Sequence, residues 1–141
     1  MFGLLLFSGF VFAAQNPILV EEEKPVRFYF STENKTAVIG QAKEIKLTLS
    51  VSQKDAYIHP QAPLKVSIES SKLKFTKKEY GHKDAKVSGT VDKLRELVFS
   101  VVTTPEKSGN FVIGAKVDFY FCTSKLCIPK SEKTSMEFHA R

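Results

Sequence analysis

Alternation of polar and apolar residues runs through much of the chain and predicts a series of short β-strands. Residues 44–52, EIKLTLSVS, alternate without an error. Strict period-two alternation is typical of a strand with one buried face and one solvent-facing face. Turn-forming residues separate this segment from others with the same rhythm. Those segments are residues 25–31, 64–69, 97–102, 110–122 and 134–139, with shorter ones near 57–58 and 87–89.

This pattern predicts an all-β fold, an immunoglobulin-like antiparallel β-sandwich of about seven to nine short strands. The one helix-like stretch, residues 91–97, is shorter than a normal helix. The sequence has no internal repeat, low-complexity tract or linker, so we expect a single domain. A hydrophobic content of 43% in 141 residues is enough for one core, and the fold should not depend on a disulfide.

The first residues of the chain predict export. Residues 1–14, MFGLLLFSGFVFAA, carry no charge. This apolar run has the length of a signal-peptide core and is too short to span a bilayer, so we predict a signal peptide over 1–14. Residues 15–141 are then the single domain, soluble after cleavage. A buried N-terminal strand or helix is the alternative. In an exported protein a cysteine pair can be oxidised and stay so.

The charge of the chain favours no particular partner. The formal charge of +6 comes from 21 basic and 15 acidic residues, and the lysines are spread singly with acids between them. That spacing is typical of a solvated face, whereas a nucleic-acid surface needs a basic cluster with aromatic residues. The sequence also lacks a Gly-rich phosphate loop and a G-x-S-x-G nucleophile motif. We therefore expect neither nucleic acid nor a cofactor to bind.

The two cysteines, Cys122 and Cys127, are the residues with the clearest chemistry. Strand alternation places Cys122 beside Tyr120 on the outward face of segment 110–122, unless a bulge intervenes. A disulfide closing so short a loop stabilises by only about 2 kcal/mol, against about 4 kcal/mol for a loop of about fifty residues. The opposite, core face carries only apolar residues: Phe111, Ile113, Ala115, Val117, Phe119 and Phe121.

A surface-facing disulfide is easily attacked by another thiolate, as exchange chemistry requires. Lys125 and Lys130 flank the pair and would favour a thiolate electrostatically. The spacing alone fits a structural clip across a β-hairpin equally well.

The cysteine hairpin and the strand that follows it, VDFYFCTSKLCIPKSEKTSMEF, resemble a known family. They are similar to the periplasmic N-terminal domain of the thiol:disulfide interchange protein DsbD and to related disulfide-corrector domains. Upstream, residues 55–60 look like the aromatic strand of that family, and residues 78–81 like its cap loop. The resemblance covers about 42–138, and only the cysteine hairpin is specific.

The resemblance implies a monomeric, immunoglobulin-like redox carrier of the bacterial periplasm. Cys122 and Cys127 would be the exchanging pair, with Cys127 forming the mixed disulfide. The pair would pass reducing equivalents from a membrane-embedded or thioredoxin-like donor to periplasmic acceptor proteins. The shielding residues over the pair would be Tyr57, Glu79, Tyr80 and Tyr120. The chain departs from the best-known members by one residue fewer between the cysteines and by a cap loop with one aromatic residue.

Two other classes of function fit the sequence. The first is a non-catalytic exported β-sandwich, a binding module in which the disulfide is only a structural clip. The second is metal handling by the cysteines with a histidine or methionine. His59, His82 and His139 show no ligand spacing, and Met136 occupies an inward strand position, so we expect no metal.

Overall fold

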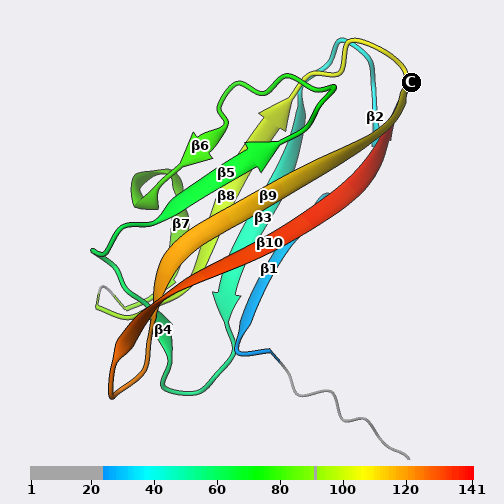
Figure 1. Ribbon diagram of the computed structural model, residues 1–141. Helices are drawn as coiled ribbons and strands as arrows, with labels where there is room; N and C mark the ends of the chain where they lie inside the picture. The colour runs from blue at the N-terminus through cyan, green and yellow to red at the C-terminus, as the bar shows by residue number, and fades with distance from the viewer. Residues whose placement is uncertain (1–23, 91) are drawn as a thin grey trace, which may run out of the picture.

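The computed structural model describes residues 24–90 and 92–141, which form an antiparallel β-sandwich of immunoglobulin-like type (Figure 1). The all-β prediction is confirmed. The predicted signal peptide lies outside the described residues. The strands are β1 (Val26–Ser31), β2 (Thr36–Ala37), β3 (Lys43–Val51), β4 (Tyr57–Ile58), β5 (Lys65–Glu69), β6 (Glu79–Tyr80), β7 (Lys86–Gly89), β8 (Leu94–Thr103), β9 (Gly109–Cys122) and β10 (Cys127–Ala140).

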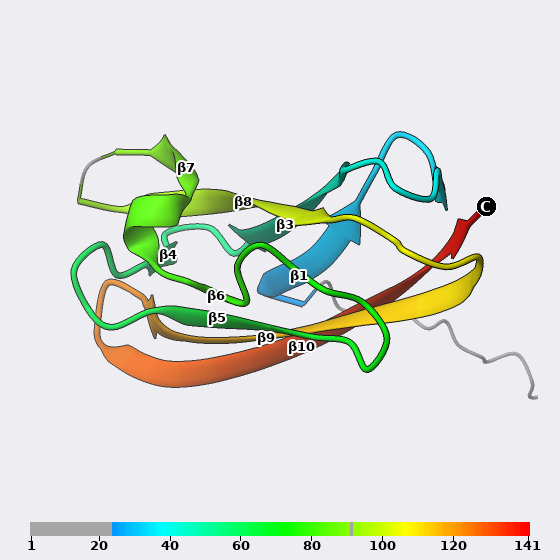
Figure 2. The same ribbon diagram turned by 90° about the horizontal axis from the view of Figure 1, so that it is seen from above.

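Two layers enclose the core, as the view from above shows (Figure 2). One layer contains β1, β3, β8 and β7, paired in that order. The other contains β10, β9, β5 and β6. The short strand β4 pairs with both β8 and β9 and thereby connects the layers at one end. At the other end β2 pairs in parallel with the last residues of β10.

Strand β9 supplies the longest row of core residues. The predicted inward side chains of β9 are all buried, from Phe111 to Phe121. They face a row from the other layer that includes Leu47, Leu49 and Phe99, each with no exposed surface. Burial of a side chain of this size stabilises by about 1.5–3 kcal/mol. This core, rather than the disulfide, therefore accounts for most of the stability.

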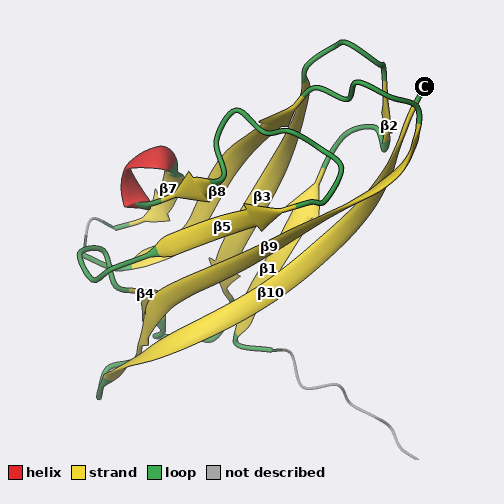
Figure 3. Ribbon diagram, turned by 45° about the horizontal axis from the view of Figure 1, so that its top comes forward, coloured by secondary structure: helices red, strands yellow, loops and turns green. Residues whose placement is uncertain are grey.

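The structure differs from the sequence prediction in two segments. Residues 94–97 of the helix-like stretch are extended in β8, because Leu97 pairs with Leu49 and is fully buried there. A single 3-10 turn at His82–Asp84 is the one helical segment among the described residues (Figure 3). None of their helices is long and apolar enough to cross a membrane.

The last strand is also longer than predicted. β10 begins at Cys127 instead of residue 134, since its ladder with β9 runs unbroken from Cys127 opposite Cys122 to Ala140 opposite Gly109. Pro129 fits within this strand because β10 lies at the edge of the layer over most of its length, where a missing N–H breaks no ladder.

Candidate functional site: the Cys122–Cys127 disulfide

The two cysteines form a disulfide across the tip of the β9–β10 hairpin. They occupy directly opposite positions in the ladder, with their Cα atoms 4.0 Å apart. The loop between them is closed by a hydrogen bond of 2.8 Å from the Thr123 N–H to the Leu126 carbonyl oxygen. The Thr123 hydroxyl oxygen also accepts the backbone N–H groups of Lys125, at 3.2 Å, and Leu126, at 3.4 Å. The loop that joins the cysteines is thus hydrogen-bonded internally as well as cross-linked.

The two halves of the disulfide differ sharply in exposure. Cys122 has 0% of its surface exposed, whereas Cys127 is exposed. Cys122 is nevertheless not part of the apolar cluster between the layers. This is consistent with the predicted outward orientation of Cys122. The expectation that solvent could reach Cys122 is wrong, because the residue is fully buried. β4 pairs with the other edge of β9 at this point, so the Tyr57 side chain lies beside Cys122 on the outer face.

The outer face around Cys122 is covered by half-buried aromatic side chains. Tyr57 of β4 lies directly opposite Cys122. One step along, the His59 N–H donates to the Tyr120 carbonyl oxygen at 3.0 Å, which continues the pairing of these two segments. Because directly opposite residues of antiparallel strands share a face, the side chains of Tyr57, His59 and Tyr120 all surround Cys122. The Lys93 ammonium in turn lies 5.7 Å from the centre of the Tyr57 ring.

Glu79 and Tyr80 lie away from the disulfide, and this corrects the expectation that they cap it. Tyr80 faces Val66, which faces Val117, five residues along β9 from Cys122. At about 3.3 Å per residue this is a separation of about 17 Å along the strand. Glu79 forms an exposed ion pair of 3.3 Å with Lys65.

Tyr80 is instead a core residue. Its ring contacts Phe99 edge-on at 6.0 Å, and its hydroxyl donates to the Lys77 carbonyl oxygen at 3.0 Å. Burial, with a smaller effect of the Asp84 carboxylate, raises the pKa of Tyr80. The pKa of Asp84 is lowered by hydrogen bonds from the Lys77 ammonium and from the Gly81 N–H.

The two predicted tuning lysines occupy different positions relative to the disulfide. Lys125 is exposed in the hairpin loop. Lys130 lies opposite Phe119 and therefore on the core face of the layer, where its ammonium is 5.1 Å from the centre of the Phe121 ring. Strand alternation explains the difference, since Cys127 and Pro129 face outward and Lys130 does not. Lys130 is thus on the wrong face to tune the sulfur atoms directly.

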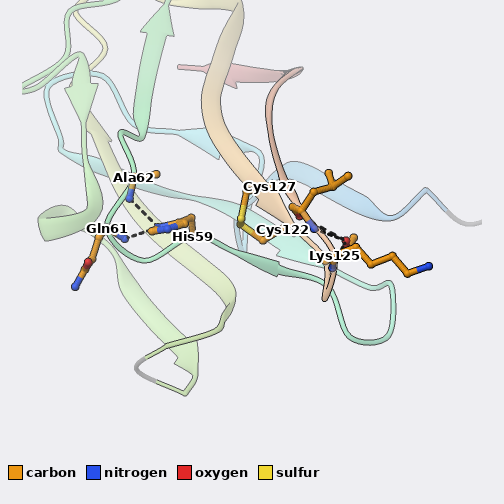
Figure 4. Close-up of a disulfide and its surroundings, with 8 residues drawn as sticks. His59, Gln61, Ala62, Cys122, Lys125 and Cys127 are labelled. Atoms are coloured by element: carbon orange, nitrogen blue, oxygen red, sulfur yellow. Dashed lines mark hydrogen bonds between the residues drawn. A yellow bond between two sulfur atoms is a disulfide. The ribbon is translucent and has the colours of Figure 1, made fainter.

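His59 is the residue that sequence reasoning missed. Its Nδ1 accepts two backbone N–H groups, from Gln61 at 3.0 Å and from Ala62 at 2.9 Å, in a turn beside the disulfide (Figure 4). The sequence signal was the placement of the histidine directly after the predicted strand 57–58 and before Pro60. Within residues 24–90 and 92–141 no three His, Cys, Asp or Glu residues form a group that could hold a metal ion.

Two hollows on the surface bear on the site. One of about 330 Å³ lies on the outer face next to the disulfide strands, lined by Tyr120, Pro129 and Pro63 among others. A larger hollow of about 570 Å³ lies between the loops after β5 and β8, where Lys72, Lys107 and Ser108 line it. The larger hollow contains no candidate reactive group, so we assign the chemistry to the disulfide end.

No protein-family model matches the chain, and no curated protein matches it. Two solved structures are similar to the chain at low identity. AggA, the major subunit of aggregative adherence fimbriae type I from Escherichia coli, is 12% identical with a TM-score of 0.44, covering 84% of this chain and 97% of AggA. A PapD-like domain of human CEP192 is 12% identical with a TM-score of 0.38, covering 92% of this chain and 95% of that domain. Similarity at this level carries no conclusion about function.

Proposed function

We propose that the protein is an exported thiol–disulfide exchange domain that works through the Cys122–Cys127 pair. The observation that carries the proposal is the unequal exposure of the pair, with Cys127 exposed and Cys122 buried outside the core. An incoming thiolate attacks one particular sulfur, and access decides which. Unequal exposure therefore favours a single direction of attack.

The reaction then follows a defined course. A partner thiolate attacks the Cys127 sulfur, a partner–Cys127 disulfide forms, and Cys122 leaves as a thiolate that takes a proton from water. A second thiolate of the partner then attacks the partner sulfur that is bonded to Cys127. A disulfide forms within the partner, and the Cys127 thiolate is released. The partner is oxidised by two electrons and the Cys122–Cys127 pair is reduced. The reverse sequence passes those electrons to an acceptor disulfide.

The disulfide contributes little to the fold, which leaves it free for such a cycle. It joins two residues that the β9–β10 ladder already holds opposite each other. In the chain-entropy model a loop this short gains only about 2 kcal/mol from the cross-link, and a preformed turn gains less. Reduction should therefore leave the sandwich folded.

The partner we propose is a thioredoxin-like protein. Leu126 adjoins Cys127 in the hairpin loop and is 56% exposed, so an exposed apolar surface lies next to the reactive residue at the hairpin tip. Contact with such a surface positions a partner before the covalent step. Export to the bacterial periplasm and supply of electrons by a membrane-embedded donor belong to this proposal, since disulfides form and persist in an oxidising compartment.

The test is reduction of the oxidised protein by thioredoxin, with thioredoxin reductase and NADPH. We expect rapid reduction of the disulfide. The reduction is measured by alkylating the free thiols and determining the mass. In the Cys122→Ser variant, Cys127 should form a stable mixed disulfide with a thioredoxin whose second cysteine is replaced by serine and whose first cysteine is activated with thionitrobenzoate, whereas the matched Cys127→Ser variant should not. A wild-type disulfide that stays oxidised would identify it as a structural clip and favour a binding module instead.

A further inference from the structure

The burial of Cys122 raises the question of what shields its sulfur on the outer face. Neighbours on the same face are Tyr57, directly opposite, and His59, one diagonal step away. Diagonal neighbours on a strand pair are within reach of long and aromatic side chains. The chain then continues into a tight turn over residues 59–62. The conformation of this turn fixes where the His59 side chain lies relative to Cys122.

The imidazole of His59 holds the turn together. Its Nδ1 accepts the N–H groups of Gln61 and Ala62 at 3.0 and 2.9 Å. An Nδ1 that accepts two hydrogen bonds carries no proton, so these bonds assign the ring proton of the neutral imidazole to Nε2. Each such bond contributes a modest net stabilisation. Together they link the backbone of residues 61 and 62 to the His59 side chain and so close the turn.

Two further hydrogen bonds anchor the closed turn to the sandwich. The His59 N–H donates to the Tyr120 carbonyl oxygen at 3.0 Å, which fixes the start of the turn on β9. The Ala62 carbonyl oxygen accepts from Nε2 of His82 at 2.9 Å, which fixes its end on the 3-10 turn. The segment is thus attached to the sandwich at both of its ends, and the two bonds to the His59 side chain connect these attachments.

We propose that His59 is the positioning residue of the exchange site, because it holds the 59–62 turn closed over Cys122 and so directs incoming thiolates to Cys127. This inference rests on the proposed exchange function. His59 acts through the turn and does not react itself. Loss of its Nδ1 contacts opens a second route of attack, at the Cys122 sulfur.

The test measures access to Cys122 in the full chain carrying Cys127→Ser, which leaves Cys122 as a free thiol. The readout is the rate of alkylation by N-ethylmaleimide, followed by mass. We expect His59→Ala to raise this rate about tenfold, because two hydrogen bonds that close the turn are lost. His59→Asn should restore slow alkylation, since its side-chain oxygen can accept the same N–H groups. In the matched Cys122→Ser background, alkylation of Cys127 should not change with residue 59.

Equal alkylation of Cys122 in the His59, Ala and Asn proteins, each folded by circular dichroism, would overturn the proposal. Thioredoxin turnover of the wild-type disulfide is measured separately, so failure of the exchange function is distinguishable from failure of the role of His59.

Discussion

The two ends of the β9–β10 ladder are joined by different chemistry. At one end Phe138 lies opposite Phe111, both are buried, and their ring centres are 5.7 Å apart. At the other end Cys127 lies opposite Cys122 on the outer face, with one residue exposed and the other buried. The phenylalanine end is closed by symmetrical apolar burial, whereas the cysteine end has a bond that solvent reaches from one side. Stability and reactivity are therefore assigned to opposite ends of one hairpin.

The largest expected effect on stability is at the phenylalanine end. Phe138→Ala should lower the free energy of unfolding by about 3–5 kcal/mol, because it removes a buried ring and leaves a cavity beside Phe111. Urea unfolding followed by circular dichroism measures this loss. A loss smaller than that caused by removing the disulfide would reverse the comparison.

The disulfide should contribute less. The double variant Cys122→Ala/Cys127→Ala should lose about 2 kcal/mol or less, as expected for a cross-link that closes a very short loop. The same urea experiment on wild-type protein, with and without dithiothreitol, provides the control. Unfolding on reduction would show that the cross-link is structural.

A smaller effect is expected at the 3-10 turn that follows β6. The hydrogen bonds from Lys77 and Gly81 lower the pKa of Asp84, so the stability they provide is present above the ordinary aspartate pKa and is lost as the pH falls from there through the lowered pKa. Asp84→Asn should cost no more than about 1 kcal/mol at neutral pH. Urea midpoints of the two proteins, measured across pH, should converge in acid. A constant difference at all pH values would contradict this assignment.

The smallest expected effect comes from the flanking lysines and is on the rate at which the disulfide is reduced. Lys125→Met should slow reduction by a negatively charged thiol such as glutathione about twofold at low ionic strength, because an exposed charge at the tip is lost. Lys130→Met is the matched control and should not change the rate, since its ammonium lies over Phe121 on the core face. Stopped-flow or quenched alkylation assays resolve the difference. Equal slowing in both variants would mean that the strand face on which a lysine lies does not affect the rate of reduction.

The fold was predictable because alternation reports which face of a strand is buried. The inward row of β9 and the strand around Leu47 and Leu49 were identified correctly from period two alone. The extended conformation of residues 94–97 was not, because burial of Leu97 opposite Leu49 is a contact between distant segments. Local patterns contain no information about such contacts.

The site was predictable only in part, for a related reason. The cysteine pairing across a hairpin followed from spacing and strand parity. The cover over Cys122 did not, because it depends on β4 arriving at the other edge of β9. The position of Tyr80 was missed because its ring is drawn into the core against Phe99. His59 was set aside because the histidines show no metal-ligand spacing, and only the geometry of its turn reveals two bonds to Nδ1.

The most direct test of the central claim is the reduction potential of the Cys122–Cys127 pair. It is measured by equilibration against glutathione, followed by alkylation and mass determination. We predict a potential above about −270 mV, within the range of exchange proteins. A value below about −300 mV would mark a structural disulfide and contradict the exchange function.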